Sequence, residues 1–125
     1  TDFSPSKASR QFNESLGSDF RKNNPRFLEP NFGFNRPYAK AFQAYAQDNG
    51  TTATALALAW CLARGENIIP IPGTRSPAHL SECALASELT LTSDMMTEIE
   101  QILPAGWAHG DRYSQAQWNG PEGYC

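Results

Sequence analysis

The stretch Ile68-Ile69-Pro70-Ile71-Pro72-Gly73-Thr74-Arg75-Ser76-Pro77 carries more information about fold and function than any other part of this chain. The apolar run Ile68–Ile71 predicts a short buried strand. Gly73 predicts a tight turn in which the backbone can approach a ligand closely. Ser76-Pro77 predicts the start of a helix, because serine is a preferred N-cap and proline is favoured at the first helical position.

This predicted turn has the chemistry of an anion site. A helix N-terminus presents unpaired N–H groups and the positive end of the helix dipole. Thr74 adds a hydroxyl, and Arg75 adds a guanidinium that can bind two phosphate oxygens at once. The spacing alone fits an ordinary capped helix with Arg75 in solvent equally well. Phosphate binding and plain capping both remain open on these residues alone.

The predicted strand has no partner within the sequence. Ile68–Ile71 is the one segment predicted to be a strand, and it contains Pro70. Buried backbone groups are nearly always paired, so an isolated strand requires partner strands. Either the rest of a barrel has been removed, or it lies on another chain, or the segment is not a strand.

Helices are predicted for much of the remaining chain. Apolar spacing predicts one helix from about Pro37 to a stop at Gly50. A second, capped by Thr51 or Thr52, is predicted over Ala53–Arg64. This helix is apolar nearly all round, so other elements must bury it on more than one side. A third is predicted from Pro77 to about Ser87, and a fourth begins after Thr92 as N-cap.

The two ends of the chain read differently from its middle. Residues 1–34 are rich in Ser, Asn, Pro and Gly and show no periodicity, which predicts a long loop packed through its phenylalanines. Residues 35–103 hold the helices, the strand and the turn, and residues 104–125 form a tail. Trp60 and Trp107 are more simply packing residues than ligand platforms.

Composition excludes several classes of partner. The 125 residues carry a net charge of −3, which disfavours nucleic acid and anionic membranes as partners. The basic cluster within residues 21–26 is expected to be a solvated loop. Cys61, Cys83 and Cys125 show neither zinc-ligand spacing nor a disulfide framework, so reduced thiols and a cytoplasmic location are expected. No apolar run approaches the ~20 residues that span a bilayer.

The turn and its surroundings resemble a known family. Ile69–Arg75, followed by Leu80-x-Glu82, is similar to the coenzyme phosphate segment of the aldo-keto reductases, where strand eight of a (β/α)8 barrel leads into the last barrel helix. Further similar landmarks follow the family's order, namely Asp19–Phe27, Ala57–Trp60, Leu89–Thr92 and Gly110–Tyr113. The resemblance covers about residues 1–118.

The resemblance implies a fold class. The expected structure is α/β, the C-terminal portion of a (β/α)8 TIM barrel, mostly helical in this chain with one clear strand. All of residues 1–125 would then belong to one barrel domain, with residues 1–34 as the long loop after strand seven. The isolated chain would need the remaining barrel strands and would be prone to self-association.

The resemblance also implies a cofactor and its contacts. The family reduces aldehydes and ketones with NADP(H), so a small-molecule carbonyl substrate is expected. The implied cofactor-binding residues are Ile71, Pro72, Gly73, Thr74, Arg75, His79, Glu82 and Cys83. Thr74 and Arg75 would bind the 2′-phosphate of the adenosine ribose. His79 and Cys83 depart from the arginine and asparagine that many members carry, which weakens the expected hold on adenine.

Two functions follow from these observations. The family's catalytic Asp, Tyr, Lys and His have no counterpart in this chain, and no metal site is expected. The first hypothesis is therefore that the chain is part of an NADP(H)-dependent oxidoreductase whose catalytic residues lie elsewhere. The alternative is a non-catalytic remnant or interaction module that retains the cofactor turn.

Overall fold

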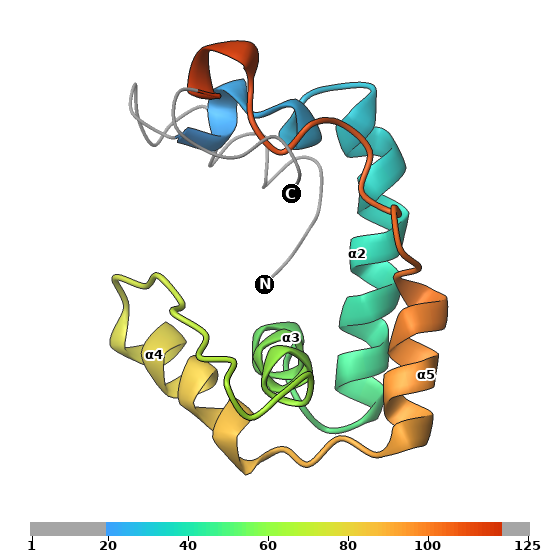
Figure 1. Ribbon diagram of the computed structural model, residues 1–125, viewed down its shortest axis with the longest axis vertical. Helices are drawn as coiled ribbons and strands as arrows, with labels where there is room; N and C mark the ends of the chain where they lie inside the picture. The colour runs from blue at the N-terminus through green and yellow to red at the C-terminus, as the bar shows by residue number, and fades with distance from the viewer. Residues whose placement is uncertain (1–19, 119–125) are drawn as a thin grey trace. The chain divides into compact units, whose positions relative to one another are not determined.

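The computed structural model describes residues 20–118 (Figure 1). Sequence predictions that fall on residues 1–19 and 119–125, including the first phenylalanines and Cys125, lie outside the described residues. The described elements are η1 (Phe20–Asn23), η2 (Pro25–Phe27), α2 (Asn31–Asp48), α3 (Ala53–Leu62), α4 (Pro77–Ala84), η3 (Leu85–Glu88), α5 (Ser93–Ile102) and η4 (Gln115–Gln117).

The chain divides into two compact units. One unit comprises the residues up to Lys40 together with those from Gly106 onward, and the other comprises Ala41–Ala105. No helix in the described part of the chain is long and apolar enough to cross a membrane.

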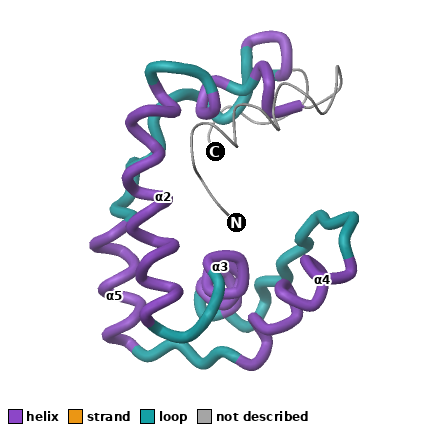
Figure 2. Tube along the Cα trace, turned by 180° about the vertical axis from the view of Figure 1, so that it is seen from behind, coloured by secondary structure: helices purple, strands orange, loops and turns teal. Residues whose placement is uncertain are grey.

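The Ala41–Ala105 unit is built around a small apolar core. Phe42, Ala46, Leu56 and Ile99 are buried together, and Leu56 has no exposed surface. They come from the C-terminal half of α2, from α3 and from α5, and the two views show α5 alongside α2 (Figures 1 and 2). Six partly buried residues pack around the core: Tyr45, Ala53, Trp60, Leu91, Ile102 and Leu103. The predicted packing role of Trp60 is confirmed.

Local signals set the helix ends. The Thr52 hydroxyl oxygen accepts a hydrogen bond from the Ala55 N–H at 3.1 Å, and the Thr92 oxygen accepts one from the Met95 N–H at 3.2 Å. The predicted N-cap Thr92 is therefore confirmed, and of the two candidates before α3 the cap is Thr52. Gly50, two residues after α2 ends, has φ +69°, a left-handed conformation that glycine adopts without strain.

The start of α2 was predicted too late. The helix begins at Asn31 and passes through Pro37 in its interior, whereas the sequence predicted a start at about Pro37. Pro37 is the seventh residue of the helix and lies in its interior. The last residues of the predicted loop 1–34 are therefore helical.

The predicted strand at Ile68–Ile71 was wrong. The described residues contain no strand, and this segment runs as an unpaired connection between α3 and α4 (Figure 2). A strand requires a hydrogen-bonded partner, and within the described residues none lies beside it. Pro70 and Pro72 also remove two of the donors that a ladder would use.

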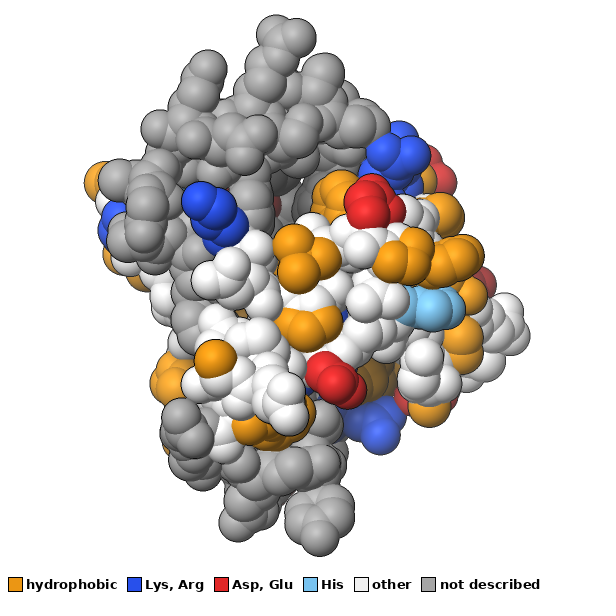
Figure 3. Space-filling view, turned by 90° about the horizontal axis from the view of Figure 1, so that it is seen from above, with side chains coloured by type: hydrophobic (Ala, Val, Ile, Leu, Met, Phe, Trp, Pro, Cys, Tyr) orange, Lys and Arg blue, Asp and Glu red, His pale blue; other side chains and the backbone are white. Residues whose placement is uncertain are grey.

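Apolar side chains remain at the surface of this unit. Six large ones are more than a third exposed: Leu62, Ile68, Ile69, Ile71, Leu80 and Leu85. The space-filling view shows hydrophobic side chains (orange) exposed among charged ones (Figure 3). This unit therefore leaves unburied a set of residues that a complete domain would cover.

We expect Leu56→Ala to lower the free energy of unfolding by about 2–5 kcal/mol, because it leaves a cavity in the core. Leu80→Ala is the matched control, since Leu80 is 58% exposed and its truncation should cost less than about 1 kcal/mol. Urea unfolding followed by far-UV circular dichroism measures both. Equal destabilisation by the two variants would contradict this description of the core.

Tyr45 links α2 to α5 and provides a pH-dependent contact. Its hydroxyl donates to the Glu98 carboxylate at 2.6 Å, and this bond, with burial and the negative charge of Glu98, raises the pKa of Tyr45 from 10.0 to about 12. The folded state thus favours the protonated phenol. Its stabilisation is complete below the unfolded pKa of about 10 and is lost as pH rises towards 12.

We therefore expect Tyr45→Phe to lose less stability than the wild-type chain between about pH 9 and pH 12. Urea midpoints measured at both pH values test this, and Glu98→Gln should reduce the pH dependence in the same way. An unchanged pH dependence in both variants would exclude the bond as its source.

Candidate cofactor-phosphate site

The turn before α4 is organised by Thr74. Its hydroxyl oxygen accepts a hydrogen bond from the Ser76 N–H and donates one to the Ser76 carbonyl, each at 3.2 Å. Arg75 lies between these two residues at a bend, and its side chain is exposed. No hydrogen bond or ion pair of Arg75 is found with any described residue. Thr74 therefore shapes the turn, and Arg75 is left available to a ligand.

The N-terminus of α4 is open. Ser76 occupies the N-cap position with φ −123° and ψ 129°, but its side chain makes no capping hydrogen bond. Ser76 therefore occupies the predicted N-cap position without making the side-chain hydrogen bond of a cap. The first-turn N–H groups of α4 thus gain no partner from the Ser76 hydroxyl, which suits an incoming anion.

Gly73 gives this turn an unobstructed backbone. A Cβ atom built at Gly73 would meet nothing within 4 Å. No neighbouring residue of the described chain would clash with a side chain at Gly73. The space beside this backbone is therefore open to another molecule.

The other predicted contacts are spread around α4. Ile71 is 92% exposed, His79 is exposed, and Glu82 and Cys83 are half-buried. The structure thus brings Gly73, Thr74 and Arg75 together at one turn. The remaining three, His79, Glu82 and Cys83, lie on α4. Of these three, only Cys83 lines the same groove as Pro72, the residue before the turn.

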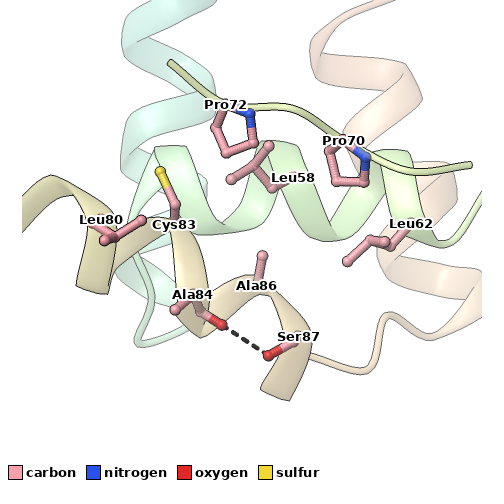
Figure 4. A pocket seen from close by; sticks show the side chains of 9 residues that line it. All are labelled: Leu58, Leu62, Pro70, Pro72, Leu80, Cys83, Ala84, Ala86 and Ser87. Carbon is pink, nitrogen blue, oxygen red and sulfur yellow. Dashed lines mark hydrogen bonds between the residues drawn. The ribbon is translucent and has the colours of Figure 1, made fainter. Parts of the chain in front are cut away.

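An apolar groove of about 270 Å³ lies between α3, α4 and the segment before the turn (Figure 4). Pro70 and Pro72 cover it, and Cys83 points its sulfur toward Pro72. Its other lining residues are Leu58, Leu62, Leu80, Ala84, Ala86 and Ser87. The Ser87 hydroxyl donates to the Ala84 carbonyl at 2.9 Å, so the lining offers few free polar groups. The groove is suited to packing rather than to holding a polar ligand.

A second feature, which the sequence did not predict, lies in the other unit. Asn35 donates from its amide nitrogen to the carbonyls of His109, at 2.9 Å, and Arg26, at 3.2 Å. The Asn35 side-chain oxygen accepts the His109 N–H at 2.7 Å. One side chain on α2 therefore satisfies both backbone groups of His109. We call these contacts, with those of Asn24 and Arg26 below, the tail clasp.

Asn24 and Arg26 extend the tail clasp. Asn24, which is 7% exposed, donates to the Arg112 carbonyl and accepts the Arg26 N–H at 3.1 Å. The Arg26 Nε donates to the Gly110 carbonyl at 3.2 Å, so Arg26 is not the solvated residue that was expected. Gly110 has φ +87°, and a Cβ there would lie 2.6 Å from the Asn31 amide nitrogen. Only glycine fits this position.

Aromatic pairs surround the tail clasp. The rings of Phe34 and His109 stack with centroids 5.1 Å apart, and those of Tyr38 and Trp107 lie 5.7 Å apart. Trp107 is half-buried, as the packing prediction expected. Within residues 20–118, no group of three or more His, Cys, Asp or Glu residues could hold a metal ion.

The family model described as Aldo/keto reductase family matches residues 4–104. The chain belongs to this family. Aldo-keto reductase yakc [NADP(+)] from Schizosaccharomyces pombe is 35% identical over 95 residues, which are 76% of this chain and 28% of the relative. Probable aldo-keto reductase 1 from Glycine max is 34% identical over 92 residues, which are 74% of this chain and 27% of the relative.

The chain spans little more than a quarter of the length of these two reductases. No solved structure was found to be similar. Membership of the aldo-keto reductase family implies a TIM barrel, and a mostly helical piece of such a barrel agrees with the described elements. The predicted family is confirmed, while its strand is not formed by these residues alone.

The tail clasp joins two segments that resemble aldo-keto reductase landmarks. Asn24 and Arg26 lie in the first, and Gly110 and Arg112 lie in the second. The residue types were visible in the sequence, since the first stretch holds two asparagines, Asn23 and Asn24, and the second begins with Gly110. No local pattern, however, pairs residues that are 74–88 positions apart.

We expect Asn35→Ala to release the tail locally. Removing this side chain leaves the His109 N–H without its acceptor, so amide hydrogen exchange at His109 should become faster. Asn49→Ala is the control, because the Asn49 side chain donates to the Tyr45 carbonyl in the other unit. Unchanged exchange at His109 in Asn35→Ala would contradict the tail clasp.

Proposed function

We propose that this chain is part of an NADP(H)-dependent oxidoreductase that reduces aldehydes or ketones by hydride transfer, and that it supplies the site for the adenosine 2′-phosphate. The observation that carries the proposal is the turn Gly73–Ser76. It presents the exposed Arg75, without a partner among the described residues, in front of the uncapped N-terminus of α4. The name of the yeast relative, which includes NADP(+), supports the choice of cofactor.

The residues of the turn fit a phosphate group. Arg75 supplies a fixed positive charge and a planar set of donors. The first-turn amides of α4 and the Ser76 hydroxyl supply further donors. Thr74 holds Ser76 in place, so its contribution is to preorganise the turn as much as to touch the ligand. The open space at Gly73 admits the ligand to the backbone.

The choice of NADP(H) over NAD(H) follows from charge. The two cofactors differ by the 2′-phosphate, and an arginine beside that group favours the phosphorylated form. When bound, NADPH supplies the hydride that reduces the carbonyl. The residues of this chain bind and orient the adenosine end of the cofactor, and the proton-transfer groups lie outside these 125 residues.

The adenine end is held less fully in this chain. Cys83 has no side-chain amide to offer to the edge of the base, and it lines the apolar groove with Pro72. The exposed imidazole of His79 can stack on the ring, and the half-buried Glu82 can accept from the adenine amine. Phosphate contacts thus contribute a larger share of the binding free energy than base contacts.

The sharpest test places this segment in a complete barrel. A chimera in which residues of this chain replace the matched 95 residues of the yeast relative provides the remaining strands. We expect Arg75→Ala in the chimera to raise the Kd for NADPH about 10- to 150-fold, the equivalent of a lost charged hydrogen bond. The Kd for NADH should change by less than about threefold, because NADH lacks the 2′-phosphate.

Arg64→Ala is the matched control for this experiment. Arg64 is an exposed arginine that pairs with Glu100 at 2.9 Å, away from the turn. Its removal should leave both Kd values unchanged. Equal losses for NADPH and NADH in Arg75→Ala would place Arg75 outside the 2′-phosphate site. For the isolated chain we expect weak or no NADPH binding by fluorescence, because the nicotinamide half of the cofactor has no surface to rest on.

A further inference from the structure

The short connection between α2 and α3 begins with Asn49-Gly50, the one Asn-Gly pair in the described part of the chain (Figure 1). The Gly50 N–H donates to the Gln47 carbonyl at 2.9 Å. The Thr51 N–H donates to the Ala46 carbonyl, also at 2.9 Å. These two bonds, with a glycine of positive φ between the helix and the next residue, form the Schellman motif that commonly ends helices. The way α2 ends therefore favours glycine at position 50.

Asn49 is the last residue before this glycine, and its side chain is exposed. Its backbone N–H and its side-chain Nδ2 both donate to the Tyr45 carbonyl, at 3.1 and 2.9 Å. A Cβ atom built at Gly50 would meet nothing within 4 Å, so no described residue crowds the backbone there. The motif thus places a side-chain amide next to a backbone nitrogen that carries no neighbouring side chain to hinder its approach.

We propose that Asn49 is a site of spontaneous deamidation and that the Schellman motif controls its rate. The backbone nitrogen of Gly50 loses its proton and attacks Cγ of Asn49. A bond forms between these two atoms, the bond from Cγ to Nδ2 breaks, and Nδ2 leaves as ammonia with the released proton. Water then opens the resulting succinimide ring at either of its carbonyls, which gives aspartate or isoaspartate. The net reaction consumes one water molecule and releases one ammonia.

Two hydrogen bonds of the folded chain hold back this reaction. The nucleophile is the Gly50 nitrogen, whose N–H is bound to the Gln47 carbonyl. The leaving group is Nδ2 of Asn49, which is bound to the Tyr45 carbonyl. Helix ends open locally at free energies below that of global unfolding. The state that reacts is therefore the one in which the last turn of α2 has opened, and the folded chain reacts more slowly than the unfolded chain.

The product weakens the motif that delayed its formation. A carboxylate at position 49 cannot donate to the Tyr45 carbonyl, and it adds negative charge beside Asp48 at the negative end of the α2 dipole. The last turn of α2 contains no basic residue to offset this charge. Deamidation therefore loosens the C-terminal end of α2. The site is separate from the turn Gly73–Ser76, so the inference goes beyond the proposed oxidoreductase function and does not depend on it.

Peptide mass spectrometry after incubation at mildly alkaline pH measures the conversion at Asn49, and an isoaspartyl methyltransferase assay detects isoaspartate. We expect conversion in the folded chain to be at least about tenfold slower than in the chain unfolded by urea. Asn49→Gln is the chemical control, because its amide would have to close a larger ring, and it should show no conversion in the same period. Equal rates in the folded and unfolded chain, or no conversion at Asn49 in either, would overturn the proposal.

A pair of matched variants tests whether local opening of α2 sets the rate. Gln47 and Gln101 are exposed glutamines in the last turns of α2 and α5. Glycine weakens a helix end, so we expect Gln47→Gly to speed conversion at Asn49 about three- to tenfold, with faster amide hydrogen exchange at Gly50. Gln101→Gly should change the rate by less than about twofold, because it weakens α5 instead. Equal acceleration by both variants, or acceleration by neither, would overturn the control by this motif.

Discussion

The missing N–H groups of Pro70 and Pro72 limit the backbone hydrogen bonds that the segment between α3 and α4 can form. They prevent this segment from donating along one edge, so a strand can form there only on the other edge. The same two rings close the apolar groove over α3 and α4, which turns Ile69 and Ile71 outward. The groove and the exposed isoleucines both depend on this alternation, which continues up to the turn Gly73–Ser76.

The parts of the fold that were predicted correctly depend on neighbours in sequence. Thr52 and Thr92 cap helices through contacts three residues away, so the local sequence predicted Thr92 and narrowed the other cap to Thr51 or Thr52. The strand at Ile68–Ile71 failed for the opposite reason, because strand formation needs a partner that these residues do not provide. The start of α2 was missed because the apolar spacing that predicted the helix becomes regular only from Tyr38, whereas the helix begins at Asn31.

The candidate site was also predicted only in part from the sequence. Its residue types were evident in the sequence, since glycine, threonine and arginine before a helix suit an anion, although plain helix capping fitted them equally well until the family resemblance was considered. The separate roles of these residues were not evident in the sequence. Only the structure shows that the Thr74 hydroxyl bonds twice to Ser76 and that the Cys83 sulfur lies at the groove. The tail clasp was beyond prediction, since Asn35 and His109 are 74 positions apart.

The turn Gly73–Ser76 and the segment before it are continuous, so the geometry of one constrains the other. Pro70 and Pro72 restrict the backbone that leads into Gly73, where a Cβ atom would meet nothing within 4 Å. The Thr74 hydroxyl then bonds twice to the Ser76 backbone, and the exposed Arg75 lies at the bend between them. The stiff proline segment and the Thr74–Ser76 hydrogen bonds together preorganise the residues that we propose as phosphate ligands.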